Sequence, residues 1–385
     1  MENEQTAAAA EPNQADGLPS VALALQGGGS HGAFTWGVLD RLLEEVERER
    51  LHIAAFSGAS AGGINATLCA CGLALGGAEA ARGKLRAFWE AVSRSGALAG
   101  NSLFGFAEPG PFGGWNIDWS PMAIALEAVG LVISPYNNPF YQDALQPLLE
   151  QALPPADLAA FNQTEGAAPV FVAATNVRDN QRVIFTQPAI SIDALRASAC
   201  LPTVFRAVTI DGVPYWDGGY LGNPPLSPLV DVVQDLILVM VNPLVRQHMP
   251  PRNAPDIQDR LNEIGFNASV VLEINAIEAV NRVLADLGGA GASKRTKYKP
   301  VRFHLIRDDP FLAEFGFVSK SSTSWALIDR LFERGRAVAD RWLAFSQGQI
   351  GRASSCDVHA ELVRPVLGVR SVDSKNHPVQ PGSTA

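Results

Sequence analysis

The segment Ile53-Ala-Ala-Phe-Ser-Gly-Ala-Ser-Ala-Gly-Gly-Ile64 decides the fold of this chain. It begins as a short apolar strand, and a helix rich in small residues follows from Ile64 to about Leu75, so Ser60 lies in a tight strand-to-helix turn. The turn matches G-x-S-x-G, in which a nucleophilic serine has a strained backbone and small neighbours let strand and helix approach. We therefore predict that Ser60 is a nucleophile and that the following helix directs its amides at the developing oxyanion.

A second glycine-rich turn precedes this one. Val21–Leu25 has the composition of a buried strand, Gly27-Gly-Gly-Ser-His-Gly32 interrupts it, and apolar residues from Phe34 to Val46 recur at helical spacing. Glycines let backbone amides point into a cavity, which suits either a phosphate group or the oxyanion of acyl transfer. The loop lacks the Gly-Lys-Ser/Thr ending of a nucleotide-binding loop, and the acidic residue of a dinucleotide fold is missing after the second strand. The predicted oxyanion donors are the amides of Gly27, Gly28 and Gly29.

The third element is Trp216-Asp-Gly-Gly219, which follows an extended segment from Ile210 to Tyr215 with a turn at Asp211-Gly212. Asp-Gly pairs are common in surface turns, so this motif alone indicates little. Beside the serine turn and the glycine loop, Asp217 becomes the expected general base. The supporting motif residues are His31, Gly32, Gly58, Gly62, Gly218 and Gly219.

The remaining pattern predicts an α/β fold with a buried sheet. Further strands are expected at 170–174, 182–186, 236–241 and 301–306, and further helices at 77–95, 256–287 and 322–346. The helix at 256–287 is expected to be interrupted at Gly265. Residues 96–142 are rich in Gly, Pro, Asn and Trp, which favours a lid, a binding loop or an insert. The aromatic residues Trp36, Phe104, Phe106, Phe112, Trp115 and Trp119 are interpreted either as an acyl site and membrane-facing lip or as ordinary core.

Composition narrows the class of protein. The chain has 385 residues, 47% of them hydrophobic, and a net charge of −9, which argues against a nucleic-acid partner. The acidic N-terminus lacks the features of a secretory signal, and no apolar run approaches a membrane span. The cysteines have no metal-type spacing and are expected to be reduced thiols of a cytoplasmic protein; they are Cys69, Cys71, Cys200 and Cys356.

The three motifs, in order and spacing, resemble those of the patatin-like phospholipase family: Gly27–Gly32, Gly58–Gly62 and Asp217–Gly219. The segment Ala197–Pro202 is similar to the small-residue stretch that this family has upstream of its aspartate. The resemblance covers about residues 20–245 and implies a three-layer α/β/α sandwich with a central, largely parallel sheet. It implies a Ser60–Asp217 dyad without histidine that cleaves lipid or other acyl esters with no metal or cofactor, and it leaves room for peripheral membrane contact.

The predicted organisation is a disordered tail at 1–18, a hydrolase domain at 19–245, an extension at 246–365 packed on the same core, and a flexible tail at 366–385. The oligomeric state is open. Family members often carry Arg or Lys where this chain has His31. If that cation holds a lipid phosphate, neutral esters or lysolipids become better substrates here. His31 is expected either to bind a head group when protonated below about pH 6.5 or to pack under the helix.

Three alternatives remain. An α/β-hydrolase would use a Ser-Asp-His triad, with His248 as the better base and His304, in a predicted strand, as the poorer one; His359 and His377 also follow Asp217. A malonyl-type acyltransferase would be expected to have histidine beside the serine, where Ala59 stands. A pseudo-hydrolase that only binds lipid or a partner would lack the nucleophile or the base, and both are present.

Overall fold

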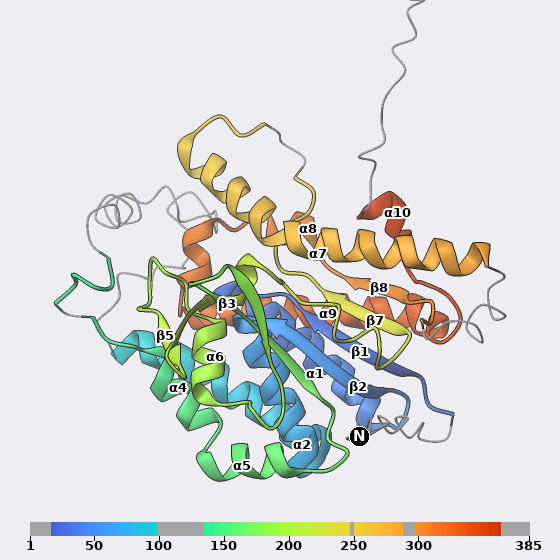
Figure 1. Cartoon of the computed structure of the whole chain (residues 1–385), viewed down its shortest axis with the longest axis horizontal. Helices are drawn as coiled ribbons and strands as arrows, with labels where there is room; N and C mark the ends of the chain where they lie inside the picture. The colour runs from blue at the N-terminus through green and yellow to red at the C-terminus, as the bar shows by residue number, and fades with distance from the viewer. Residues whose placement is uncertain (1–16, 99–133, 140, 247–249, 288–297, 363–385) are drawn as a thin grey trace, which may run out of the picture.

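The computed structural model describes residues 17–98, 134–139, 141–246, 250–287 and 298–362. An eight-stranded sheet lies at its centre, with helices on both faces (Figure 1). The strands follow one another in the order β5-β6-β3-β2-β1-β7-β8, and β4 pairs with β3 off this path. Their bounds are β1 Ser20–Leu25, β2 His52–Ala59, β3 Val170–Asn176, β4 Gln181–Phe185, β5 Val208–Ile210, β6 Val213–Asp217, β7 Asp235–Val239 and β8 Arg302–Ile306.

Five neighbouring strands of the sheet, from β3 to β8, run parallel, whereas β4, β5 and β6 pair antiparallel. The parallel strands are buried on both faces, as their nearly unbroken apolar sequences indicate. The predicted α/β fold with a largely parallel central sheet is therefore confirmed.

The helices divide between the two faces of the sheet. One apolar cluster joins the sheet to α1, α2, α4, α5 and α9, and a second joins it to α7 and α10. The helix bounds are α1 Gly32–Glu47, α2 Ala61–Leu98, α4 Leu145–Ala152, α5 Pro155–Gln163, α6 Ile192–Ser198, α7 Ala254–Asp286, α8 Asp309–Leu312, α9 Trp325–Ser346 and α10 Val358–Glu361; short 3-10 turns are η1 Gly29–His31, η2 Gly218–Tyr220, η4 Phe317–Ser321 and η5 Gln347–Gln349.

Helix α9 packs directly against α1. A side-chain carbon at Gly37 would overlap the backbone of Phe332, and one at Gly335 would overlap the backbone of Phe34. The two helices therefore touch backbone to backbone, which only glycine permits. Residues of α9 belong to the same apolar cluster as α1.

Helix α2 contains both helices predicted at 64–75 and 77–95. Its backbone leaves the helical region at Gly76 and Gly77, so the two parts meet at a kink. By length and composition α2 could cross a membrane, but 67% of its most apolar window is buried inside this protein. A mostly buried core helix passes the same test of length and composition, so this helix is weak evidence for a membrane span. The interruption predicted at Gly265 is absent, because α7 runs as one element through it.

The register on β3 places two strand ends beside each other. Ala59, the last residue of β2, pairs with Ala173, and Asp217, the last residue of β6, pairs with Ala174. Because β4 pairs with β3 over both of these stretches, β2 and β6 must share the opposite edge of β3. They run towards each other along that edge and end at adjacent residues.

Candidate active site

Ser60 occupies the turn between β2 and α2. Its φ is +54°, a left-handed conformation that is uncommon for serine and costs conformational energy. The amide of Ser60 donates hydrogen bonds to the carbonyl of Ser198, at 3.1 Å, and to its Oγ, at 2.9 Å. A side-chain carbon at Gly62 would overlap the carbonyl of Leu25, so strand and helix approach as closely as the sequence predicted. The turn is thereby held in its strained form.

Asp217 ends β6 and is fully buried. Its Oδ1 accepts a hydrogen bond from the amide of Gly219 at 2.7 Å, and its own amide donates to the carbonyl of Cys200 at 2.8 Å. Its Oδ2 has no hydrogen bond of normal geometry from any described residue. A buried carboxylate oxygen with spare acceptor capacity is what a proton acceptor requires.

Burial raises the pKa of Asp217 from 3.8 to about 7. The amide of Gly219 and the hydroxyl of Ser60 act in the opposite direction, because each stabilises the carboxylate. The hydroxyl of Ser60 therefore lies close to Asp217 although its hydrogen bond is not well aligned. Such bonds are often long in unliganded sites and tighten when substrate binds.

The glycine loop lies against the serine turn. A side-chain carbon at Gly27 would lie 2.7 Å from Cβ of Ser60. The amide of Gly27 is already used, because it donates to Oδ1 of Asn223 at 2.7 Å. Gly28 and Gly29 are half-buried, and their amides have no hydrogen-bond partner among the described residues. Of the three predicted donors, only Gly28 and Gly29 thus have an amide available.

Gly29 is held where a side chain cannot fit. Its φ is +58°, and a side-chain carbon there would overlap the carbonyl of Lys320 in η4. The extension beyond residue 245 therefore forms one wall of the loop. The family-like segment ends before this wall, so the sequence motifs gave no indication of it.

Four buried amide side chains hold the loop from behind. Oε1 of Gln26 accepts from the amides of Val241 and Asn242, each at 2.9 Å, and its Nε2 donates to Oδ1 of Asn267 at 2.8 Å. The carbonyl of Gly27 accepts from the side chains of Asn242 and Asn223, at 3.0 and 3.3 Å.

These amides replace the hydrogen bonds that water would otherwise supply to buried backbone. Gln26, Asn223, Asn242 and Asn267 were all missed from the sequence. They are far apart along the chain, and isolated Asn and Gln residues give no periodic signal.

His31 is buried under the start of α1. Its Nε2 lies 2.8 Å from Oγ of Ser319, and its ring meets Phe315 edge-on at 5.6 Å. Burial, and then the positive charge of Lys320, lower the pKa of His31 from 6.5 to about 3. The imidazole is therefore neutral across physiological pH. Of the two expectations for His31, packing under the helix agrees with the structure and protonation near pH 6.5 does not.

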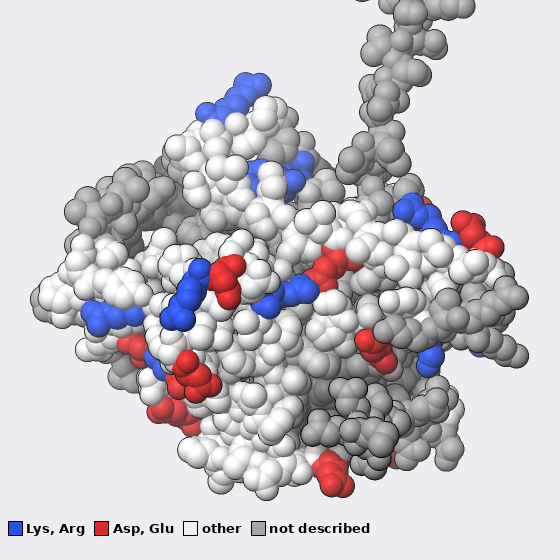
Figure 2. Space-filling model, in the orientation of Figure 1, with Lys and Arg blue, Asp and Glu red and all other residues white. Residues whose placement is uncertain are grey.

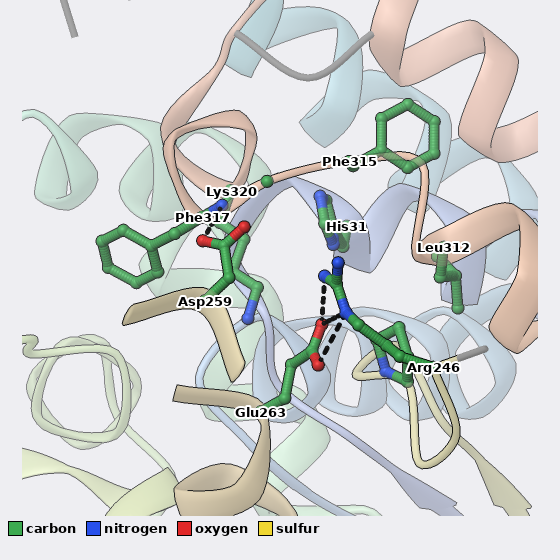
Figure 3. Close-up of a pocket in the computed structure, with 10 residues that line it drawn as sticks. His31, Arg246, Asp259, Glu263, Leu312, Phe315, Phe317 and Lys320 are labelled. Carbon is green, nitrogen blue, oxygen red and sulfur yellow. Dashed lines mark hydrogen bonds and ion pairs between the residues drawn. The ribbon is translucent and has the colours of Figure 1, made fainter. Parts of the chain in front are cut away.

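Figure 3 shows the surroundings of His31. Arg246 lies between the imidazole and Glu263, and its guanidinium is held by Glu263 at 2.6–3.0 Å. The cavity there has a volume of about 10 Å³, enough for roughly one water molecule. It is too small for a lipid head group, so it is no substrate site in this conformation.

The histidines of the triad alternative lie elsewhere. His304, in β8, is fully buried between Ser355 and Asp235, with both ring nitrogens 3.0 Å from an oxygen. Asp235 begins β7, so His304 faces the end of the sheet opposite to Ser60. His248 and His377 lie outside the described residues, as do the side chain of His359 and the aromatic residues predicted at 104–119.

Of the two expectations for the aromatic residues, packing in the core agrees with the structure for Trp36. It is 1% exposed and stacks on Trp89 at 6.5 Å, within the core between α1 and α2. Its apolar character contributes to packing alone. The four cysteines carry free thiols, as predicted.

Comparisons with known proteins identify a family and list solved structures of low similarity. The profile of the family described as "Patatin-like phospholipase" matches residues 23–230. VipD from Legionella pneumophila is 15% identical, with a TM-score of 0.38, and the match covers 85% of this chain and 67% of that one. The type III effector protein ExoU is 16% identical, with a TM-score of 0.32, and the match covers 86% of this chain and 54% of that one. No curated protein matches this chain.

Proposed function

The chain belongs to the patatin-like phospholipase family, and from this premise we propose that it hydrolyses acyl esters of lipids through Ser60 and Asp217. The family membership supports a lipid hydrolase in general terms. The roles of the individual residues rest on the geometry of the site.

One observation carries the assignment of the pair. β2 and β6 end at adjacent residues of β3, which brings the turn that holds Ser60 beside the carboxyl group of Asp217. The two side chains are close enough for the hydroxyl to stabilise the carboxylate. A nucleophile within reach of a base whose pKa lies near 7 is the arrangement that activates a serine at neutral pH.

The proposed reaction has two stages. Asp217 takes the proton of the Ser60 hydroxyl as Oγ attacks the ester carbonyl carbon, and the carbon–oxygen bond to the alcohol breaks as Asp217 returns that proton to the leaving oxygen. Water then attacks the acyl-enzyme with Asp217 again as base, and the carboxylic acid leaves as Ser60 regains its proton. The proposed reaction uses no cofactor or metal.

The oxyanion is proposed to bind the amides of Gly28 and Gly29. Both lie in the loop that touches the serine turn, and neither amide is used within the described residues. The N-terminus of α2, directly after Ser60, adds the positive end of its dipole. Gly27 is assigned a structural role instead, because Asn223 already accepts from its amide.

The position at which relatives often carry a cation holds a buried, neutral His31, so we propose that recognition of a head-group phosphate does not pass through this residue. We further propose a cytoplasmic enzyme that meets its lipid at a membrane surface or as dispersed monomers.

A set of esters tests the proposed function. p-Nitrophenyl esters of increasing chain length, a phosphatidylcholine and a lysophosphatidylcholine should be given to the wild-type chain and to Ser60→Ala. We expect hydrolysis of at least one ester by the wild type, none by the variant, and labelling of Ser60 alone by a fluorophosphonate. A wild type that neither hydrolyses any of these esters nor reacts with the probe contradicts the proposal.

A further inference from the structure

Helix α7 carries a row of exposed apolar residues along its outer face. The larger side chains are between 39% and 69% exposed, with Leu272 the most exposed of them. Alanines fill the gaps in the row and are exposed as well. The row consists of Ile257, Leu261, Ile264, Ala268, Leu272, Ala276, Val280, Val283 and Leu287.

The spacing shows that these residues share one face. Successive members are three or four positions apart, the interval that brings side chains together on a helix. The row spans 257–287, about 45 Å of helix. The opposite face already packs on the sheet through Val270 and Ile274. No described residue covers the outer row, and exposed apolar surface of this extent marks an interaction site.

The row is symmetric about Leu272. Ala268 and Ala276 lie four residues on either side of it, and Ile264 and Val280 lie eight residues on either side. The outer members repeat this relation at the same distances, Leu261 with Val283 and Ile257 with Leu287. Reversing the direction of the helix thus leaves the pattern of large and small residues unchanged.

We propose that two copies of this chain associate through α7, antiparallel, around a two-fold axis at Leu272. In a two-fold contact each residue i that meets residue j is matched by j meeting i. An antiparallel pair of α7 helices would place Leu272 against itself, Ala268 against Ala276 and Ile264 against Val280. The symmetry of the row is therefore what a self-complementary helix contact requires and what a membrane or an unrelated partner does not.

The centre of the row also has the right shape for close packing. Ile264, Ala268, Leu272, Ala276 and Val280 follow each other at intervals of four residues. Side chains so spaced form a ridge that fits the groove of a second helix at a crossing angle of about 50°. The alanines on either side of Leu272 let the two backbones approach. Helices that cross at this angle touch only near the crossing point, so we place the main contact around Leu272, between Ala268 and Ala276.

Charges along the helix do not oppose this pairing. In the same register Arg282 would face Asn262, Asp286 would face Gln258, and Glu278 would face Phe266. No like charges meet. Figure 2 shows the surface over the orange part of α7 as largely uncharged, with Lys, Arg, Asp and Glu scattered around it. An apolar centre with a sparsely charged rim is the composition of homodimer interfaces.

The main test is the mass of the chain in solution. Sedimentation at micromolar concentration should give a dimer for the wild type. Leu272→Glu and Leu272→Lys should each be monomers with unchanged circular dichroism, because each brings two like charges together at the axis; we expect the dimer dissociation constant to rise at least about 100-fold. An equal mixture of the two variants should restore a dimer that contains one chain of each. Phe345→Glu, at an 84% exposed position in α9, is the matched control and should stay dimeric.

A cysteine test checks the register. Leu272→Cys should form a disulfide with its own copy on mild oxidation. Ala268→Cys should not do so with itself, but it should cross-link to Ala276→Cys in a mixture, because these positions face each other only when the helices are antiparallel.

Three results would overturn the proposal. A monomeric wild type that binds vesicles of phosphatidylcholine and phosphatidylglycerol, with loss of binding in Leu272→Glu, would assign the row to a lipid surface instead. A wild-type dimer that Leu272→Glu leaves intact would place the interface elsewhere. A wild type that is monomeric and binds neither vesicles nor itself would also contradict the proposal.

Discussion

Ser60 and Asp217 come from strands that run in opposite directions and end against consecutive residues of β3, Ala173 and Ala174. The two residues are 157 positions apart in the sequence, but a single register on β3 fixes the distance between their backbones. Their side chains are coupled as well, because the hydroxyl of Ser60 lowers the pKa of a carboxyl group that burial raises to about 7.

The first prediction concerns pH. Asp217 must be ionised to accept the proton of Ser60, and its pKa is about 7. kcat/KM for a neutral ester should therefore rise about tenfold per pH unit below pH 7 and level off above it. Asp217→Asn should reduce kcat by about four orders of magnitude, on the scale of a lost acid–base partner. His304→Ala is the control, because its ring contacts Asp235 and Ser355 rather than the site. A flat profile between pH 5 and 8 would contradict the assignment of Asp217 as base.

The raised pKa of Asp217 should also make the free energy of unfolding depend on pH. The pKa of Asp217 is higher in the folded chain, about 7, than the ordinary value of 3.8, so the folded state retains a proton that the unfolded state has lost. The stability that protonated Asp217 gives to the folded state is fully present below pH 3.8 and is lost as the pH rises to about 7. Above pH 7 the folded chain must hold an ionised, buried carboxyl group, which is unfavourable. Asp217→Asn removes this charge and should raise the free energy of unfolding above pH 7, by up to about 4 kcal/mol for a difference of three pKa units. Urea unfolding at pH 4 and pH 8 measures it; an equal effect at both pH values would contradict the raised pKa.

The backbone conformation of Ser60 should destabilise the folded chain. Its φ of +54° is unfavourable for any residue with a side chain and open to glycine. Ser60→Gly should therefore stabilise the chain by about 1 kcal/mol relative to Ser60→Ala, while both variants lose esterase activity. Thermal unfolding of the pair gives the comparison. Equal melting temperatures would mean that the turn relaxes when the hydroxyl is removed.

Asn223 is predicted to be a positioning residue. It binds both the amide and the carbonyl of Gly27, at 2.7 and 3.3 Å, and so sets the loop that offers the amides of Gly28 and Gly29. Asn223→Ala should lower kcat about 10- to 100-fold with little change in KM, because an oxyanion donor acts mainly in the transition state. Asn281→Ala is a matched control: Asn281 binds the amide and the carbonyl of Val301 in the same way, both at 2.9 Å. A similar loss of kcat in both variants would indicate general destabilisation.

His31 should not respond to pH. Its pKa of about 3 keeps it neutral, so wild-type profiles on an anionic phospholipid and on a neutral ester should show no separate transition near pH 6.5. His31→Arg would bury a charge beside Lys320 and should lower the melting temperature by several degrees without improving activity on anionic lipid. A gain in that activity in the folded variant would restore the head-group hypothesis.

Much of the fold could be predicted from sequence because its signals are local. Val21–Leu25 and the residues after Ile53 have the composition of buried strands, and glycine turns mark where each one ends. The turn at Asp211-Gly212 also lies where predicted, since it needs the positive φ that these residues tolerate. By contrast, a continuous α7 was not predicted, because Gly265 is only a weak helix breaker in a helix held by other contacts.

Only part of the active site could be predicted from the sequence, for a related reason. Ser60 and Asp217 stand in motifs, whereas the residues that hold the loop, such as Asn223 and Gln26, are single amides whose partners lie about 200 positions away. The burial of His31 depends on Phe315 and Ser319, in a segment beyond the family-like region. Such contacts arise from tertiary packing alone, and no local pattern in a single sequence indicates them.

Since β3 sets the spacing of the two reacting groups, the polypeptide between residues 60 and 170 need not be covalently continuous for the pair to form. A chain divided within 99–133 into two co-expressed fragments should still assemble around β3, because α2 would remain attached to β2 in the first fragment and β3 to β6 in the second. Each fragment would then carry one half of the dyad and be inert alone. Esterase activity would then appear only when the two fragments associate, which makes this hydrolase suited to use as a split reporter enzyme.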